Sequence, residues 1–418
     1  MLTSIACVAS VAAQEPQPAD AVPDALPRLP EDFGTTSEEP EALVTLTVDG
    51  RAGVFYDDNV LRSPTDEEGD FTAVIAPRLR LRSRTERYRW DASAEVEAGE
   101  YRNISGNDYV DFDLRAAATW QGSETNQLSG RIRFRDDHQP IGSFPDDPER
   151  AARDATDFRR GEAALEWRYT PKQLFVEWVP EVLYFNYDNN RREDGTPIFN
   201  DDRDRTEFAQ LVRVGYRTGE KLLPYGFGTY NQRDYRENIG GVESFDRDSE
   251  GFTVGAGVSY GEPDDNAAFD IRIGYLEQDY RAGSLPDVED FAVSASAFWQ
   301  PALRWRLTGA LERAVKETTL EGASSYLETD VELGAQYALR SDIDLYAEAS
   351  YTNRDFQTNP TARENREDDV YRGVVGATWR LPSNWYVDAH YDLTVRDSTD
   401  PDVEYDSNTF NLGLGARF

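Results

Sequence analysis

The sequence contains very little sulfur and few positive charges. One cysteine, Cys7, and one methionine occur in 418 residues, which excludes a disulfide framework and a multi-cysteine metal site. Lysine and arginine number 44 against 79 aspartate and glutamate, a formal net charge of −35. So acidic a chain is unsuited to nucleic acid, because binding a phosphate backbone needs clustered positive charge. No apolar run in the sequence approaches the roughly 18 residues that a membrane-spanning helix requires.

Aromatic residues, in contrast, are plentiful. They make up 12% of the chain, with 22 Tyr, 20 Phe and 8 Trp. Disordered chains contain few aromatics, so the high charge does not indicate a wholly disordered protein. Length alone suggests two or three domains, although closed barrels of this size form a single unit. The composition therefore points to a large, acidic β-protein.

The first 40 residues differ from the rest. Residues 1–13 are a short apolar run that ends in small residues, which predicts a signal peptide cleaved after Ala13. Two alternatives are a lipoprotein acylated at Cys7 and a buried N-terminal segment. Residues 14–40 contain six prolines among acidic and small residues, and this composition predicts a disordered periplasmic segment.

Strict alternation of apolar and polar residues is the main signal after residue 41. Residues 88–98 read Tyr-Arg-Trp-Asp-Ala-Ser-Ala-Glu-Val-Glu-Ala, and 71–82, 109–120 and 385–393 follow the same rule. Period two is typical of β-strands, in which successive side chains point to opposite faces of the sheet. Each predicted strand thus has one apolar face and one ionic face.

The connections between these segments also alternate. We count eighteen segments, joined by eight short polar turns and nine longer acidic connections in strict alternation. Short turns at one end and long loops at the other are typical of transmembrane barrels. Residues 41–418 are therefore predicted to form an all-β, closed antiparallel outer-membrane β-barrel of about 18 strands (16–18), with short periplasmic turns and long acidic extracellular loops. A soluble β-sandwich is the alternative, but it would need apolar residues to cover each apolar face.

Two aromatic features support a membrane setting. All eight tryptophans fall on the apolar parity of their segments, mostly near short turns, as in the aromatic girdles of membrane barrels. Apolar residues then alternate up to the last residue. This pattern resembles the closing strand that the barrel-assembly machinery recognises, although a soluble edge strand could share it. The predicted assembly signal comprises Phe410, Leu412, Leu414 and Phe418.

The ionic faces would line an aqueous lumen, since barrels of sixteen to eighteen strands leave a channel. Arginines dominate early and carboxylates later, which would place a transverse field across the pore; alternatively, these charges simply pair across strands. The predicted pore-lining residues are Arg78, Arg80, Arg82, Arg87, Arg89, Arg131, Arg133, Arg135, Glu162, Glu166, Glu177, Glu181, Glu328, Asp330, Glu332, Asp344, Glu348, Asp388 and Asp392. Loops 138–157 and 188–204 are long enough to fold inward and narrow the bore.

The first strand adds a family resemblance. It reads Val-Phe-Tyr-Asp-Asp-Asn-Val over 54–60, and a loop and a strand with Pro77 follow. This resembles the opening of the putative β-barrel porin type 2 family of Gram-negative outer membranes, although an Asp-Asp-Asn run also suits an ordinary turn. The resemblance, over roughly 41–418, implies a porin-like outer-membrane channel for polar solutes or exported polysaccharide. Implied partners are outer-membrane lipid, lipopolysaccharide, the barrel-assembly machinery and polysaccharide-export proteins.

Catalysis is poorly supported. Only His138 and His390 occur, and a hydrolase would need a nucleophile or an activated water beside a histidine. His390 lies between Asp388 and Asp392 on the ionic face, where a solvated histidine is the simpler interpretation, and His138 is interpreted as a surface residue. The sequence predicts no enzyme, cofactor or metal; a lipid-modifying enzyme and an adhesin-like scaffold are the alternatives.

Overall fold

The computed structural model describes most of the chain after the N-terminal region. The described residues are 44–142, 152–219, 221–236, 246–261, 265–318, 320, 322–358 and 365–418. The predicted signal peptide (1–13) and the proline-rich segment (14–40) lie outside them.

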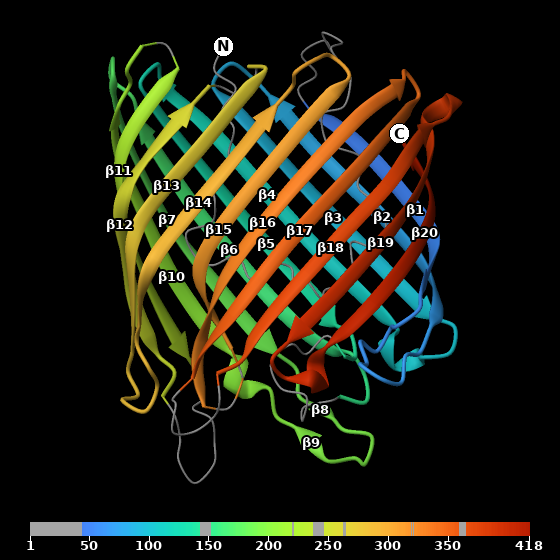
Figure 1. The fold of residues 1–418 in the computed structure, drawn as a ribbon. Helices are drawn as coiled ribbons and strands as arrows, with labels where there is room; N and C mark the ends of the chain where they lie inside the picture. Colours follow the sequence, from blue (N-terminus) through green and yellow to red (C-terminus); the bar gives the residue numbers. More distant parts are fainter. Residues whose placement is uncertain are drawn as a thin grey trace.

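Eighteen antiparallel strands form one closed sheet (Figure 1). Each strand alternates between the two faces, as period-two side chains require. The strands are β1 (Thr45–Asp57), β2 (Asp70–Arg84), β3 (Tyr88–Tyr101), β4 (Tyr109–Ser123), β5 (Asn126–Gln139), β6 (Thr156–Tyr169), β7 (Leu174–Tyr187), β10 (Arg205–Tyr216), β11 (Leu222–Tyr235), β12 (Ser249–Tyr260), β13 (Ala267–Tyr280), β14 (Val288–Trp299), β15 (Trp305–Glu317), β16 (Ala323–Arg340), β17 (Ile343–Thr358), β18 (Glu367–Arg380), β19 (Trp385–Ser398) and β20 (Tyr405–Arg417).

The first and last strands close the barrel. β1 pairs with β2 on one side and with β20 on the other, from Asp49 opposite Arg417 to Asp57 opposite Thr409. Beyond β20, the backbone N–H of Phe418 donates to the carbonyl of Val48 at 2.9 Å. The sheet therefore closes on itself, so that the backbone groups within its ladders are paired without water.

The outer face is apolar around the barrel. All eight tryptophans are at least one-third exposed on this face, as their parity predicts. The C-terminal residues Phe410, Leu412, Leu414 and Phe418 are likewise exposed. A closed cylinder with an apolar outside and charged residues inside confirms the predicted fold class and excludes the sandwich alternative.

Connections differ between the two ends of the barrel. The short turns lie at the top of Figure 1 and the long connections at the bottom, where the small hairpin β8 (Asn190–Arg191) and β9 (Pro197–Ile198) projects from the wall. Short 3-10 turns complete the connections: η1 (Ser105–Asn107), η3 (Asp201–Arg203), η4 (Pro382–Asn384) and η5 (Pro401–Val403). Among the described residues there is no helix with the length and apolarity to cross a membrane.

Candidate functional site

The predicted lumen residues lie on strand positions that face the interior, with one exception. Arg87 lies exposed in the turn before β3, because that strand begins only at Tyr88. Its side chain therefore belongs to the rim of the barrel rather than to the lumen wall. The burial of Glu177, Glu181 and Asp388 reflects the crowding of side chains on the concave face.

Opposite charges pair locally on the wall formed by β1–β7 and β10. Arg133 donates to Asp113 at 2.6 Å, and Arg80 donates to Asp91 at 2.6 Å. Arg131 donates to Glu162 at 3.0 Å. Further pairs join Arg51 to Glu95, Arg131 to Glu181, Arg168 to Glu177 and Arg213 to Glu177. The early arginines are thus compensated by neighbouring strands, which favours cross-strand pairing over a transverse field.

The wall at β15–β17 is less compensated. Glu312 lies directly opposite Asp330 on the next strand, which places two like charges side by side. In the described part of the chain, Glu312, Glu332 and Glu348 form no ion pair. The wall at β15–β17 therefore carries carboxylates that no arginine or lysine of the described residues compensates.

The wall splits at the long-loop end between β14 and β15. Their ladder ends at Val293 opposite Arg313. Beyond this point β14 continues to pair with β13 as far as Val288, and β15 continues with β16 as far as Glu317. The β13–β14 and β15–β16 pairs therefore separate over the last residues of their strands at this end. The end of the β15–β16 hairpin can then bend away from the wall.

The separated end of β16 is buried on both of its faces. Its first six residues, Ala323–Glu328, are all buried, whereas its later residues are largely half-buried or exposed. A barrel strand in the wall would expose alternate side chains. Leu327, on the outward parity, instead packs with Val315 against Leu276, Tyr280 and Val288, which are on the neighbouring wall. The hairpin end therefore lies inside the lumen.

A buried acid, Glu317, attaches this hairpin end to strands β11 and β13. Glu317 of β15 accepts hydrogen bonds from Arg233, from the Tyr235 hydroxyl at 2.5 Å and from the Tyr280 hydroxyl at 3.4 Å. Arg233 also donates to the carbonyl of Val315 at 3.0 Å. Since β12, β13 and β14 stand between β11 and β15 in the sheet, these contacts reach across the inside of the barrel.

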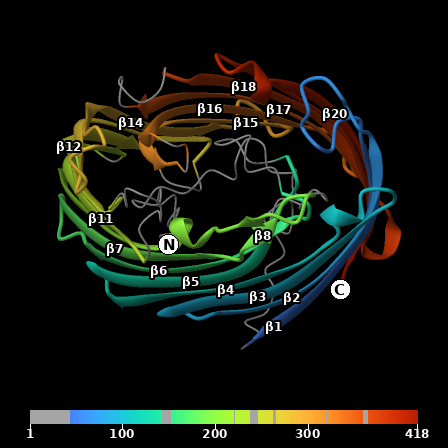
Figure 2. The same ribbon diagram turned by 90° about the horizontal axis from the view of Figure 1, so that it is seen from below.

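The hairpin end, defined as residues 314–318 and 322–328, thus occupies part of the lumen and forms a constriction there. Figure 2 shows the barrel from this long-loop end. The sequence predicted a constriction from loops 138–157 or 188–204. Residues 143–151 lie outside the described part. The loop 188–204 carries β8 and β9, which project beyond the end of the barrel. Arg203 of this loop nevertheless reaches the wall, where it donates to Gln139 at 2.9 Å and lies over the Tyr187 ring. In the described part of the chain, wall strands therefore narrow the bore as well, which the sequence did not predict.

Three buried interior residues are absent from the predicted pore-lining set. The same parity that marks Glu162 also marks Arg160, and Arg205 and Arg233 follow from the alternation of β10 and β11. All three are buried. Extending the parity to the ends of each segment would have found them, because these strands continue two to four residues further than the most regular part of the pattern.

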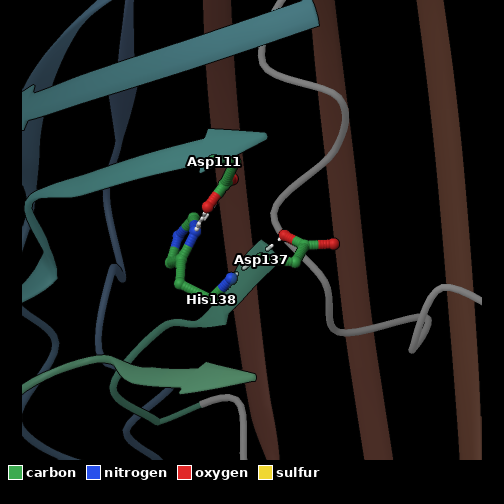
Figure 3. A group of neighbouring side chains, drawn as sticks. All are labelled: Asp111, Asp137 and His138. Atoms are coloured by element: carbon green, nitrogen blue, oxygen red, sulfur yellow. Dashed lines mark hydrogen bonds and ion pairs between the residues drawn. The ribbon is translucent and has the colours of Figure 1, made fainter. Parts of the chain in front are cut away.

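His138 is not a surface residue, as the sequence analysis had it. It belongs to β5, and its side chain is 8% exposed because its ring stacks on Tyr109 at 4.0 Å between centroids. Its Nδ1 lies 2.9 Å from a carboxylate oxygen of Asp111, and its backbone N–H donates to Asp137 at 3.0 Å (Figure 3). The three residues could offer ligand atoms within 4.8 Å of one another. Asp111 occupies Nδ1, whereas Nε2 is buried without a hydrogen-bond partner in the described part of the chain.

His390 has no nucleophile on its ring. Its Nδ1 lies 3.2 Å from Asp388. The hydroxyls near this pair belong to Thr378 and Tyr346, and both donate to Asp388 rather than to the histidine. The arrangement is a hydrogen-bonded cluster in the wall, and it lacks the nucleophile–base contact of a hydrolase.

Together these features define the class: a closed 18-stranded antiparallel barrel with an apolar exterior and a charged, narrowed lumen. A family model described as "Putative beta-barrel porin 2" matches residues 46–418. The chain belongs to this family, as the resemblance of its opening strand predicts. No curated protein matches the sequence.

Solved structures of similar shape have little sequence in common with the chain. OccK2 (OpdF) of Pseudomonas aeruginosa, in its complex with glucuronate, is 12% identical with a TM-score of 0.46, covering 90% of this chain and 98% of its own. The ferric enterobactin receptor PfeA of the same organism is 9% identical with a TM-score of 0.45, covering 89% of this chain and 80% of its own. OccAB3 of Acinetobacter baumannii is 9% identical with a TM-score of 0.43, covering 90% and 99%.

Proposed function

We propose that this protein is a passive channel for polar solutes in the outer membrane of a Gram-negative bacterium. The observation that carries the proposal is the combination of an apolar exterior with an ionic interior in one closed cylinder. Such a wall is stable in a bilayer only if water fills its interior, because removing carboxylates and guanidiniums from water costs a large free energy. The long acidic loops would face outward and the short turns the periplasm, as in other membrane barrels.

Membership of the porin family supports transport rather than catalysis. We propose no enzymatic activity, since neither histidine has a nucleophile beside its ring. The partners in this setting would be lipopolysaccharide and other outer-membrane lipid around the wall. The C-terminal alternation, with Phe418 last, would be the signal for the assembly machinery.

The hairpin end supports small solutes rather than a polymer as the cargo. The hairpin end occupies part of the bore at the long-loop end, where Glu317 fastens it to β11 and β13. A bound hairpin limits the cross-section of the solute, as constrictions do in other pores. Export of polysaccharide, the other cargo implied by the family resemblance, would require this end to move out of the lumen.

Reconstitution in planar lipid bilayers tests the proposal. The protein should produce persistent, ohmic single-channel currents in potassium chloride. Small neutral polyethylene glycols should enter the pore and lower its conductance, and large ones should not. The absence of current from correctly folded protein would contradict a channel and favour an adhesin-like scaffold, whereas entry of large polymers would favour polysaccharide as the cargo.

A further inference from the structure

Five interior residues at the long-loop end form one lateral row across neighbouring strands. They are directly opposed, pair by pair, in the ladders of β5, β6, β7, β10 and β11. We call this set the arginine row: Arg135, Arg160, Phe185, Arg205 and Tyr235.

The row places like charges side by side. Arg135 and Arg160 are direct cross-strand partners, and like charges in this position destabilise a sheet. Arg135 has one carboxylate partner, Asp137 at 3.2 Å. Arg160 is only 5% exposed, yet within the described residues it pairs with no carboxylate and its Nε has no hydrogen-bond partner. A buried, uncompensated guanidinium is costly to the free protein, which points to a ligand.

The aromatic members give the row a flat surface. The Arg160 guanidinium lies 5.2 Å from the ring centroid of Phe185, and the Arg205 guanidinium lies 4.1 Å from the same centroid. Stacking on a ring holds a guanidinium in a fixed plane, with its N–H edge available for a planar oxyanion. Arg205 is compensated by Glu207 at 2.7 Å, so among the described residues Arg160 is the arginine of the row without a carboxylate partner.

The row also lies at the constriction. Tyr235, its last member, donates its hydroxyl to Glu317 at 2.5 Å. The hairpin end therefore borders the row at its Tyr235 end. The side chain of Arg135 is 19% exposed, which leaves the row accessible from the lumen on that side.

We infer that the arginine row is a binding subsite for anionic solutes that carry a carboxylate or phosphate group. The inference rests on the proposed channel function and names its solute class. An oxyanion bound there would accept charge-assisted hydrogen bonds from Arg160 and Arg135 and relieve their repulsion. The row thus selects for anions inside a chain whose net charge is −35.

Current block in planar bilayers tests the subsite. Potassium gluconate and inorganic phosphate, added separately, should each reduce the chloride current with a measurable half-blocking concentration; comparison of the two arms shows whether carboxylate or phosphate is preferred. Neutral sorbitol should not block. In Arg160→Gln the half-blocking concentration should rise at least about tenfold, because a charge-assisted hydrogen bond to a buried group is lost.

The matched control is Arg372→Gln, which removes the same charge from the opposite wall, where Arg372 pairs with Asp392 at 2.6 Å. Its half-blocking concentration should change less than about twofold, since no oxyanion contact is removed. Heat-modifiable migration checks folding; if Arg160→Gln does not assemble, Arg135→Gln carries the same expectation. An unchanged half-blocking concentration in the folded variant, an equal shift in Arg372→Gln, or block by sorbitol would overturn the subsite.

Calorimetry on the detergent-solubilised protein separates this inference from the channel proposal. Binding of gluconate or phosphate that disappears in Arg160→Gln, in a protein without current, would overturn the channel and keep the subsite. Current without any anion binding would keep the channel and overturn the subsite.

Discussion

The two ends of β16 follow the same alternation but meet different surroundings. Towards the short turn, Leu333 is 61% exposed on the outer face, as a lipid-facing residue of the wall should be. Towards the long-loop end, Ser325 and Leu327 have the same parity and are fully buried, because the strand has crossed into the lumen. Parity therefore tells which face of the strand a residue occupies. Only the point at which the β14–β15 ladder ends tells what that face contacts.

Of the changes that test this comparison, removing the hairpin end altogether should have the largest effect, which is on the conductance of the pore. Replacing residues 314–328 by an Asn-Gly turn joins Arg313 to Thr329, which are direct cross-strand partners, and Asn-Gly favours a tight hairpin. The shortened strands would both end in the wall, so single-channel conductance should rise by roughly twofold or more.

The control for this variant shortens the β8–β9 hairpin, which projects outside the barrel, and its conductance should stay near that of the unmodified protein. Equal conductance in all three proteins would mean that the hairpin end does not narrow the pore.

Weakening the attachment of the inward end should have a smaller effect. Glu317→Ala leaves Arg233, Tyr235 and Tyr280 without their shared acceptor, and breaking a buried ion pair costs about 3 kcal/mol. Local opening of the hairpin end should become correspondingly easier, so amide hydrogen exchange in 314–317 and 323–328 should be roughly a hundredfold faster. Glu404→Ala, at an exposed position in the last long connection, should leave the exchange unchanged. Similar protection in both variants would show that Glu317 does not fasten the hairpin.

The smallest expected effect is a difference in stability between two leucine substitutions, one at each end of β16. Ser325→Leu adds volume where the side chain is fully buried, and overpacking of this kind costs about 1–3 kcal/mol. Ala335→Leu adds the same kind of side chain on the outer face of the wall, opposite Leu307, where it should change stability by less than about 0.5 kcal/mol. Urea unfolding in detergent, followed by tryptophan fluorescence, measures both. A larger loss for Ala335→Leu than for Ser325→Leu would contradict the inward position of the strand end.

Local pattern was sufficient for the wall. The eighteen strands, the alternation of short and long connections and the outward tryptophans all follow from period two and turn composition, which are properties of neighbouring residues. The inward hairpin could not be predicted in this way, because Leu327 and Val315 suit lipid and a packed interior equally well. Its position depends on where the β14–β15 ladder ends, which is a contact between segments.

The arginine row was missed for a related reason. Arg160 stands near the start of its strand, after a long connection, and its repulsion with Arg135 exists only in the register of β5 and β6. Sequence parity could have placed both arginines inside the barrel. It could not have shown that they are neighbours, or that Arg160 has no carboxylate partner among the residues that the structure describes.

Because the hairpin end is an extension of two wall strands, the circumference of the barrel alone does not set the width of the passage. Lengthening or shortening β15 and β16 by a few residues beyond Arg313 and Thr329 would alter permeability while the other ladders stay intact. Proteins with this architecture can therefore diverge in what they admit without adding or losing a strand, and an engineer could tune the aperture through a single hairpin.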